Sequence, residues 1–110
     1  MRLLFLGDVV GKGGCDFLMK KLPDYKRKNC IDVCIANGES SAQGNGVTPQ
    51  SIEMLLDSGV DFVTLGNHTF KRPEIMEYLE GDVPVVRPYN YPVGAPGQGV
   101  GIIDKGRYRI

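Results

Sequence analysis

The chain has 110 residues, and its 13 basic and 13 acidic side chains give a formal net charge of zero. This length allows at most one domain, and a hydrophobic fraction of 42% is typical of a folded globular protein. The neutral balance argues against a long basic surface for duplex nucleic acid, although a small phosphate ligand would need only local charge.

The cysteine count and the apolar runs bear on localisation. The sequence has three cysteines, at positions 15, 30 and 34, and no signal peptide precedes them. An odd number of cysteines without a signal peptide favours reduced thiols and a cytoplasmic protein. No apolar run approaches the roughly 20 residues of a membrane span, so no membrane association is expected. Cys30 and Cys34 lack the second Cys/His pair of a zinc site, and Cys34 is expected in the sheet interior.

The first 30 residues predict a strand followed by a helix. Residues 2–6 form an almost wholly apolar run that ends at Gly7-Asp8, which predicts a parallel strand buried on both faces. The glycine-rich residues 11–14 predict a flexible turn, and residues 15–22 then have helical periodicity. Pro23 is expected to end or restart that helix.

The middle of the chain repeats this pattern. Residues 31–36 predict a second strand, and the polar loop over 37–47 is long enough to suggest a functional role. Thr48 and Pro49 have the residue types of a helix N-cap and first helical position, and Gly59 is expected to end the helix that they begin.

The third repeat consists of a strand over 60–65, a helix over about 73–79 and a short strand over 83–86. Ile75, Met76 and Leu79 are expected to face inward. Strands that alternate with helices predict an α/β fold with a mostly parallel sheet and flanking helices.

The pattern changes after Arg87. Prolines and glycines make the next segment irregular, and residues 100–110 predict a β-hairpin with its turn at Lys105-Gly106. The second arm of this hairpin ends at Ile110 without a closing element, so we expect residues 1–110 to form a single partial domain.

Polar side chains follow each of the three main predicted strands. Asp8 follows the first strand, Glu39 lies just after the second, and Asn67 and His68 follow the third. The carboxyl ends of parallel strands meet at one edge, where α/β proteins bind their ligands, and carboxylate and carboxamide oxygens are hard donors for divalent metals. Each residue alone also fits a turn, a solvated acid or a structural histidine. Together they predict one metal and phosphate site.

Other motifs leave more than one interpretation open. Residues 7–13 resemble a P-loop, but three residues separate the glycines where four are needed, and no Ser or Thr follows Lys12. No dinucleotide-binding fingerprint follows the first strand. Arg87 is either an ordinary surface charge or a phosphate clamp at a strand end.

Four blocks of sequence resemble the YmdB-like bacterial metallophosphoesterases, members of the calcineurin-like phosphoesterase superfamily. They are Gly-Asp-Val-Val-Gly at 7–11, Asn-Gly-Glu at 37–39, Gly-Asn-His-Thr at 66–69 and Arg-Pro-Tyr-Asn-Tyr-Pro at 87–92. Their order and spacing are similar to the family pattern over essentially the whole chain. The second and fourth blocks are the more specific to this family.

The resemblance implies the N-terminal half of a calcineurin-like α/β sandwich and a dinuclear metal-dependent phosphodiesterase. Its substrate would be a 2′,3′-cyclic nucleotide or related phosphodiester, and its two divalent ions would be Fe or Mn. By this resemblance Asp8 binds one metal, Glu39 bridges both and Asn67 binds the other. His68 would face the substrate phosphate as a general acid or electrostatic stabiliser, which suits histidine near neutral pH.

The chain departs from the family pattern in two ways. Ser40 stands where the family usually has an asparagine near the metal, and a hydroxyl has a shorter reach. Family members are also more than twice as long, and their remaining histidine ligands lie in the second half, so this fragment alone is expected to be inactive. Two alternatives remain: a non-catalytic phosphate- or nucleotide-binding module, and a regulatory or interaction fragment. A homo-oligomer is compatible with each.

Overall fold

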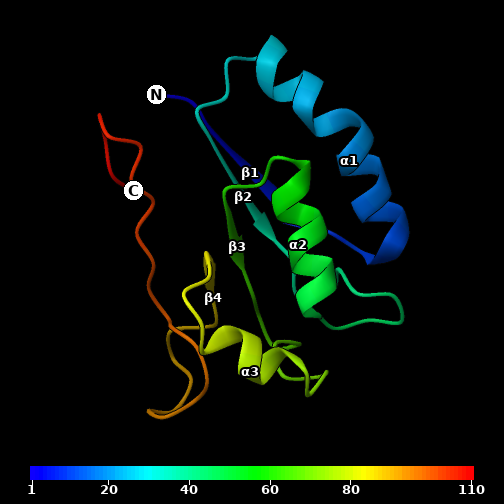
Figure 1. The fold of residues 1–110 in the computed structure, drawn as a ribbon, viewed down its shortest axis with the longest axis vertical. Coiled ribbons are helices and arrows are strands. Elements are labelled where there is room, and N and C mark those ends of the chain that lie inside the picture. Colours follow the sequence, from blue (N-terminus) through cyan, green and yellow to red (C-terminus); the bar gives the residue numbers. More distant parts are fainter.

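The computed structural model describes residues 1–110 and has a four-stranded sheet covered by helices (Figure 1). All neighbouring strands are parallel, in the order β1-β2-β3-β4, so each strand lies beside its neighbour in the chain. The predicted α/β class with a parallel sheet is therefore confirmed. In chain order the elements are β1 (Leu3–Asp8), α1 (Gly11–Lys28), β2 (Val33–Asn37), α2 (Pro49–Ser58), β3 (Phe62–Thr64), α3 (Ile75–Leu79) and β4 (Val85–Val86).

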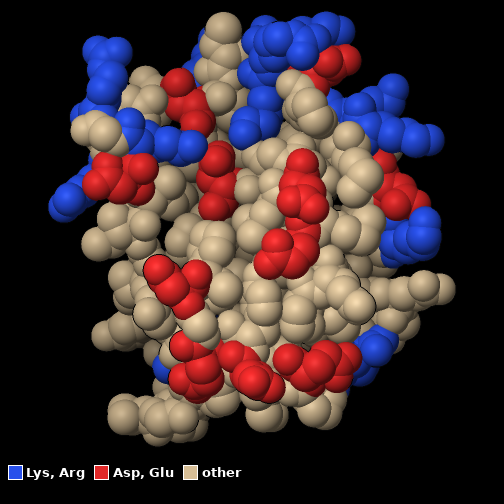
Figure 2. Space-filling model, in the orientation of Figure 1, with Lys and Arg blue, Asp and Glu red and all other residues tan.

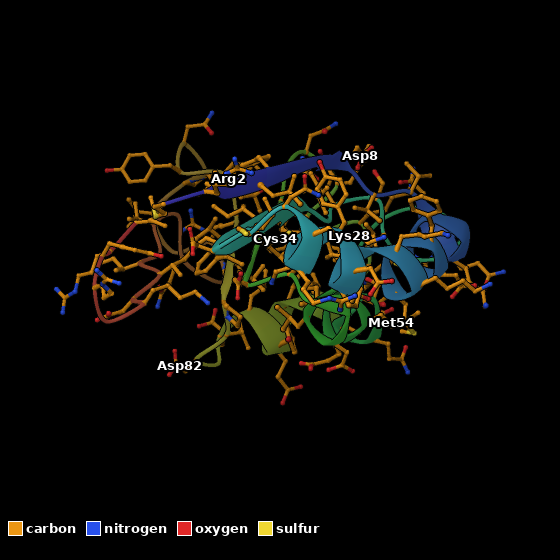
Figure 3. The ribbon with its side chains drawn as sticks, turned by 90° about the horizontal axis from the view of Figure 1, so that it is seen from above. Arg2, Asp8, Lys28, Cys34, Met54 and Asp82 are labelled. Carbon is orange, nitrogen blue, oxygen red and sulfur yellow. The ribbon has the colours of Figure 1, made fainter.

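The core lies between the sheet and its helices. Helices α1 and α2 pack against each other on one side of the sheet (Figure 1). Ile52 and Leu55 of α2 are fully buried there, together with Cys34 and Val63 of the sheet. Cys34 thus lies in the sheet interior as predicted. Figure 3 shows it beside β1, whose ribbon runs between the labelled Arg2 and Asp8. No helix combines the length and the apolar character that crossing a membrane requires.

The opposite face of the sheet is only partly covered. Phe5, Ile35 and Phe62 are neighbours across β1, β2 and β3 on that face. Residues near Gly101 lie against the Phe62 ring, whereas Phe5 and Leu3 remain 56% and 42% exposed. The prediction that the first strand is buried on both faces is therefore wrong. Helices α1 and α2 cover the other face of the sheet and leave Phe5 and Leu3 exposed.

Helix α1 is longer at both ends than the sequence predicts. It begins at Gly11, where a flexible turn is expected, and continues through Pro23 to Lys28. Pro23 is exposed, and contacts on both sides of it hold the helix in place. Leu22 is buried, and the Lys26 ammonium donates to the Gly59 carbonyl with an N···O distance of 2.6 Å. The stabilisation from tertiary contacts of this kind is larger than the cost of the backbone hydrogen bond that Pro23 cannot donate.

Helix α2 confirms the predicted cap. The Ser51 N–H donates to the Thr48 hydroxyl oxygen, the Ser51 hydroxyl accepts from the Thr48 N–H, and Pro49 occupies the first turn. Gly59 ends the helix with a φ of 116°, a left-handed conformation that glycine adopts without a steric penalty.

Two later predictions need correction. In α3 Ile75 and Leu79 are buried, but Met76 is 42% exposed because it lies on the outer side of this one-turn helix. The predicted hairpin is reduced to one antiparallel bridge, between Asp104 and Arg109, and to mutual backbone hydrogen bonds between Ile103 and Ile110. Its arms are too short to form regular strands.

Candidate functional site

Backbone hydrogen bonds join the turns that follow neighbouring strands. The Val9 N–H donates to the Asn37 carbonyl (N···O 3.1 Å), and the Gly38 N–H donates to the Thr64 carbonyl (2.9 Å). These bonds continue the sheet ladders beyond the regular strands. The turns after β1, β2 and β3 therefore start from the same edge of the sheet, as the sequence predicts.

Glu39 connects the second turn to the third. Its Oε2 accepts a hydrogen bond from the His68 backbone N–H at 3.0 Å, and its own N–H donates to Oδ1 of Asn37 at 3.0 Å. The Asn37 side chain also lies 3.4 Å from Oε1 of Glu39. Only 15% of the Glu39 side chain is exposed, and a carboxylate at this depth needs such donors. These contacts fix the direction in which Glu39 points.

The close approach of Glu39 requires glycine at position 66. A β-carbon built on Gly66 would overlap with the Glu39 carboxylate. The backbone of Gly66 is not in the left-handed region, so lack of space rather than backbone conformation excludes a larger residue. The glycine before Asn67 and His68 thus lets the carboxylate reach the third turn.

The His68 side chain presents Nδ1 to the same carboxylate. Nδ1 lies 3.4 Å from Oε2 of Glu39, and it is buried without a hydrogen-bond partner. A buried nitrogen without a partner is uncommon in folded proteins. A small movement of the ring would allow Nδ1–H to donate to Glu39, while 37% of the side chain stays exposed. The imidazole therefore turns its Nδ1 edge toward Glu39 without a hydrogen bond to it.

Asp8 and Asn67 lie at the same sheet edge but are exposed. Asp8 pairs with Asn37 in the register of β1 and β2, which places it beside the second turn. No group of three or more His, Cys, Asp or Glu side chains comes close enough to hold a metal ion. Of the predicted site residues only Glu39 and His68 are in contact. The donor types fit a divalent metal, but this chain supplies only part of a ligand set.

Ser40 belongs to the connection between the first two turns. It is 7% exposed, and its carbonyl accepts a hydrogen bond from the Gly11 N–H at 2.9 Å. This bond ties the loop that carries Glu39 to the start of α1, close to the turn that contains Asp8. Ser40 is thus adjacent to Glu39 in the chain and bonded to the segment that follows Asp8.

Arg87 is engaged by its own loop. Its guanidinium donates to the carbonyls of Pro96 (3.1 Å), Pro88 (3.1 Å) and Ala95 (3.5 Å). All three guanidinium nitrogens are used, and the side chain organises the irregular segment after β4. Phosphate binding by Arg87 stays a prediction, and it would compete with these three bonds.

Several residues that the sequence analysis did not single out support the site. The buried Ser41 hydroxyl donates to the Gly38 carbonyl at 2.7 Å and lies 2.8 Å from the Ser51 hydroxyl, which links the Glu39 loop to the cap of α2. Thr69 and Tyr91 both donate side-chain hydrogen bonds to the Gly66 carbonyl. Only Ser51 had a usable sequence signal, because it lies three residues after the predicted N-cap.

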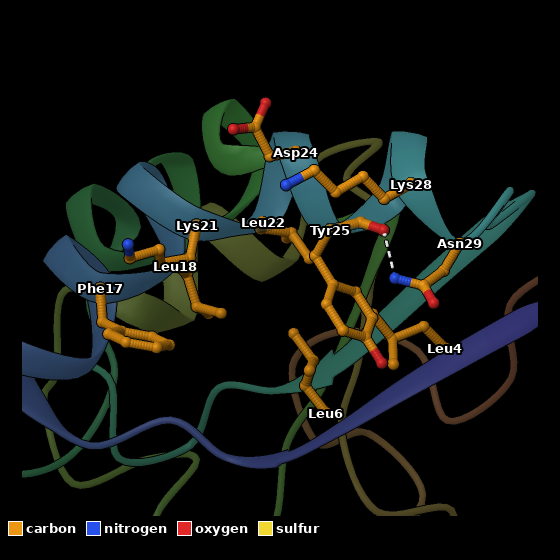
Figure 4. Close-up of a pocket in the computed structure, with 10 residues that line it drawn as sticks. All are labelled: Leu4, Leu6, Phe17, Leu18, Lys21, Leu22, Asp24, Tyr25, Lys28 and Asn29. Carbon is orange, nitrogen blue, oxygen red and sulfur yellow. Dashed lines mark hydrogen bonds between the residues drawn. The ribbon is translucent and has the colours of Figure 1, made fainter.

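A hollow of the surface lies away from these residues. It encloses about 560 Å³ between α1 and β1, and Leu4, Leu6, Leu18 and Tyr25 are among its lining residues (Figure 4). None of the predicted site residues lines it. Its walls are mostly apolar, and it runs along β1, whose outer edge pairs with no other strand.

Comparison with known proteins identifies the family. The YmdB-like protein family matches residues 4–110. The chain belongs to this family. A relative in Bacillus subtilis, named 2′,3′-cyclic-nucleotide 2′-phosphodiesterase, is 45% identical over 101 residues, and a Mycoplasma genitalium protein named as a phosphatase/phosphodiesterase is 37% identical over 90 residues.

Two solved structures agree with the fold. A hypothetical protein from Thermus thermophilus superposes with a TM-score of 0.90 at 42% identity, over 99% of this chain. A Mycoplasma pneumoniae structure described as a novel phosphatase gives a TM-score of 0.85 at 30% identity, over 97% of this chain. These matches cover 42% and 40% of the two structures, and the two curated relatives are covered over 38% and 32%. This YmdB-like chain therefore spans less than half the length of its relatives.

Proposed function

We propose that this chain is the N-terminal part of a metal-dependent phosphodiesterase, a hydrolase whose substrate is a 2′,3′-cyclic nucleotide or a related phosphodiester. The observation that carries the proposal is the contact between Glu39 and His68, which joins two predicted site turns at the carboxyl edge of the sheet. Membership of the YmdB-like family and the names of the relatives give the reaction class. Residues 1–110 are then a partial domain, inactive alone.

In this proposal Asp8, Glu39 and Asn67 hold two divalent ions, Fe or Mn. Bound ions of this kind lower the pKa of a bound water and neutralise phosphate charge. Glu39 would help to hold such ions because its carboxylate lies between the second and third turns. Asp8 and Asn67 are exposed and free to turn toward such ions.

His68 has a separate task. Its backbone N–H donates to Glu39 and Nδ1 faces the same carboxylate, which supports a task for the ring other than binding metal. During hydrolysis the water oxygen would bond to phosphorus and release a proton to solvent, and the bond from phosphorus to the leaving oxygen would break. His68 would deliver a proton to that leaving oxygen and regain one from solvent. The partial exposure of the side chain leaves it accessible to a substrate.

The charge distribution favours this proposal over a simple anion-binding module. Figure 2 shows Lys and Arg concentrated at the end of the molecule where α1 finishes, with Lys26, Arg27 and Lys28 in its last turn. Acidic side chains are frequent toward the opposite end of this face. The Arg87 guanidinium is already bonded to three carbonyls. A phosphate at the strand ends would therefore have to displace these bonds to reach the Arg87 guanidinium.

The test uses a completed enzyme, in which residues 1–110 replace the matching part of the Bacillus subtilis relative. We expect this completed enzyme to bind divalent metal and to hydrolyse 2′,3′-cyclic nucleotides. Asn67→Ala should lower metal occupancy, measured by elemental analysis, and activity should fall with it. Asp24→Asn is the matched control, because Asp24 is an exposed carboxylate paired with Arg27 on α1. Full metal content in Asn67→Ala would remove Asn67 from the ligand set.

The 110-residue chain itself separates the alternatives. A non-catalytic module would bind inorganic phosphate or a nucleotide without metal, which isothermal titration calorimetry in the presence of a chelator would detect. The proposal expects no such binding by the isolated chain. An inactive completed enzyme that folds and binds metal would contradict the assignment of phosphodiester hydrolysis.

A further inference from the structure

The Gly66 carbonyl is a meeting point for hydrogen-bond donors. It accepts the Thr69 N–H at 3.1 Å, the Thr69 hydroxyl, and the Tyr91 hydroxyl at 3.0 Å. Thr69 is fully buried, and its two bonds close the turn that contains Asn67 and His68. The bond from Tyr91 is different, because it comes from a segment 25 residues away.

The Tyr91 segment is well supported where it meets the turn. The Tyr91 ring packs at an angle of 38° against Phe70, with ring centroids 5.8 Å apart. The Tyr91 N–H donates to the Pro88 carbonyl at 3.3 Å, and Arg87 holds the carbonyls of the same segment. The irregular segment after β4 is thus held by hydrogen bonds and packs against the turn that contains Asn67 and His68.

We propose that Tyr91 is a positioning residue for His68. Glu39 holds the third turn from one side through the His68 N–H, and Tyr91 holds it through the Gly66 carbonyl. With both contacts in place, the His68 ring keeps one orientation relative to the site. Without the Tyr91 hydroxyl, the turn retains only its internal bonds and the contact with Glu39. This role rests on the proposed phosphodiesterase function.

The decisive variant is Tyr91→Phe, which removes one oxygen and keeps the ring on Phe70. The matched control is Tyr89→Phe, because Tyr89 belongs to the same segment and is 78% exposed. In the completed enzyme, amide hydrogen exchange at Thr69 and Lys71 should be about 3- to 10-fold faster in Tyr91→Phe, the scale of one neutral hydrogen bond. Tyr89→Phe should leave these rates unchanged. Equal rates in the two variants would overturn the proposal, even if the completed enzyme has no activity.

In the completed enzyme the kinetic pattern separates positioning from general stability. Tyr91→Phe should lower kcat on a cyclic nucleotide about 3- to 10-fold, with little change for a nitrophenyl ester, whose leaving group needs no proton. KM should stay the same on both substrates. In a His68→Ala background Tyr91→Phe should cause no further loss. An equal loss on both esters, or an additive loss in the double variant, would show a structural role instead.

Thr69→Val provides a second variant for the same carbonyl. It removes the other hydroxyl donor at nearly constant volume, and we expect the same selective loss on the cyclic nucleotide. A Thr69→Val enzyme that loses both activities equally, together with a Tyr91→Phe enzyme that loses neither, would also overturn the positioning role.

Discussion

The carboxylate of Glu39 accepts a hydrogen bond from the backbone N–H of His68, with Oε2 3.0 Å from that nitrogen and 3.4 Å from Nδ1 of the same residue. This contact joins two turns that lie 29 residues apart in the chain. It ties the His68 backbone to Glu39 while part of the His68 side chain stays exposed. A ligand and a proton donor should therefore respond differently to substitution.

His68→Ala in the completed enzyme should keep its metal and lose turnover. We expect metal content to be unchanged and kcat on a cyclic nucleotide to fall by roughly 10²–10⁴, the usual scale for one general acid. The loss should be smaller on a nitrophenyl ester. Elemental analysis and turnover on both esters would check this. Parallel loss of metal and activity would make His68 a ligand, and loss of neither would make it structural.

Gly66→Ala should destabilise the fold, because the new β-carbon would push the partly buried Glu39 carboxylate away from the His68 N–H. Overpacking of this kind costs about 1–3 kcal/mol in the free energy of unfolding. Gly7→Ala is the matched control, since a β-carbon there would meet nothing within 4 Å. Urea unfolding of both variants measures the difference. Equal stability would mean that the Glu39 carboxylate does not occupy this position.

Ser40→Asn should strengthen metal binding in the completed enzyme. Ser40 is buried between the turn that carries Asp8 and the loop that carries Glu39, and a carboxamide reaches farther than a hydroxyl. The expected gain in metal affinity is about 10- to 100-fold, the usual scale for changes close to a bound metal. Metal titration against a competing chelator would measure it, and an unchanged affinity would place Ser40 outside the metal surroundings.

The open sheet face predicts self-association of the 110-residue chain. Phe5 is 56% exposed beside Ile35, and the outer edge of β1 is unpaired. Unpaired apolar edges and exposed apolar faces promote association. Phe5→Lys should increase the monomer fraction in sedimentation experiments, whereas Tyr89→Lys, which changes an aromatic residue 78% exposed outside the sheet, should not. A wild-type chain that is a highly stable monomer would contradict the partial-domain interpretation.

Cysteine reactivity should follow burial. Burial raises the pKa of the Cys34 thiol to about 11, whereas Cys30 is exposed. At pH 8 iodoacetamide should therefore modify Cys30 first and Cys34 only after unfolding, as mass spectrometry would show. Equal modification of both cysteines in the folded chain would contradict this.

The unfolded chain loses its Cys34 proton at a lower pH than the folded chain. The protonated Cys34 thiol therefore contributes to the free energy of unfolding. This contribution is complete below the ordinary thiol pKa of 9.0 and is lost as the pH rises toward about 11.

Residue types at particular positions were enough to predict the elements whose ends depend on local backbone geometry. Thr48, Pro49 and Gly59 predicted both ends of α2, because capping and left-handed backbone are local properties of the chain. The alternation of apolar runs and helices predicted the parallel sheet and the convergence of its turns, since parallel strands must end at one edge.

Tertiary contacts decided the rest. Helix α1 passes through Pro23 because Leu22 and Lys26 are held from outside the helix, which no local preference of the sequence indicates. The sequence alone indicates that Asp8, Glu39, Asn67 and His68 follow neighbouring strands, and their common site stays a prediction. The contact of Glu39 with His68 and the support from Tyr91 were not predictable, because both join residues more than 20 positions apart whose distance only the folded backbone determines.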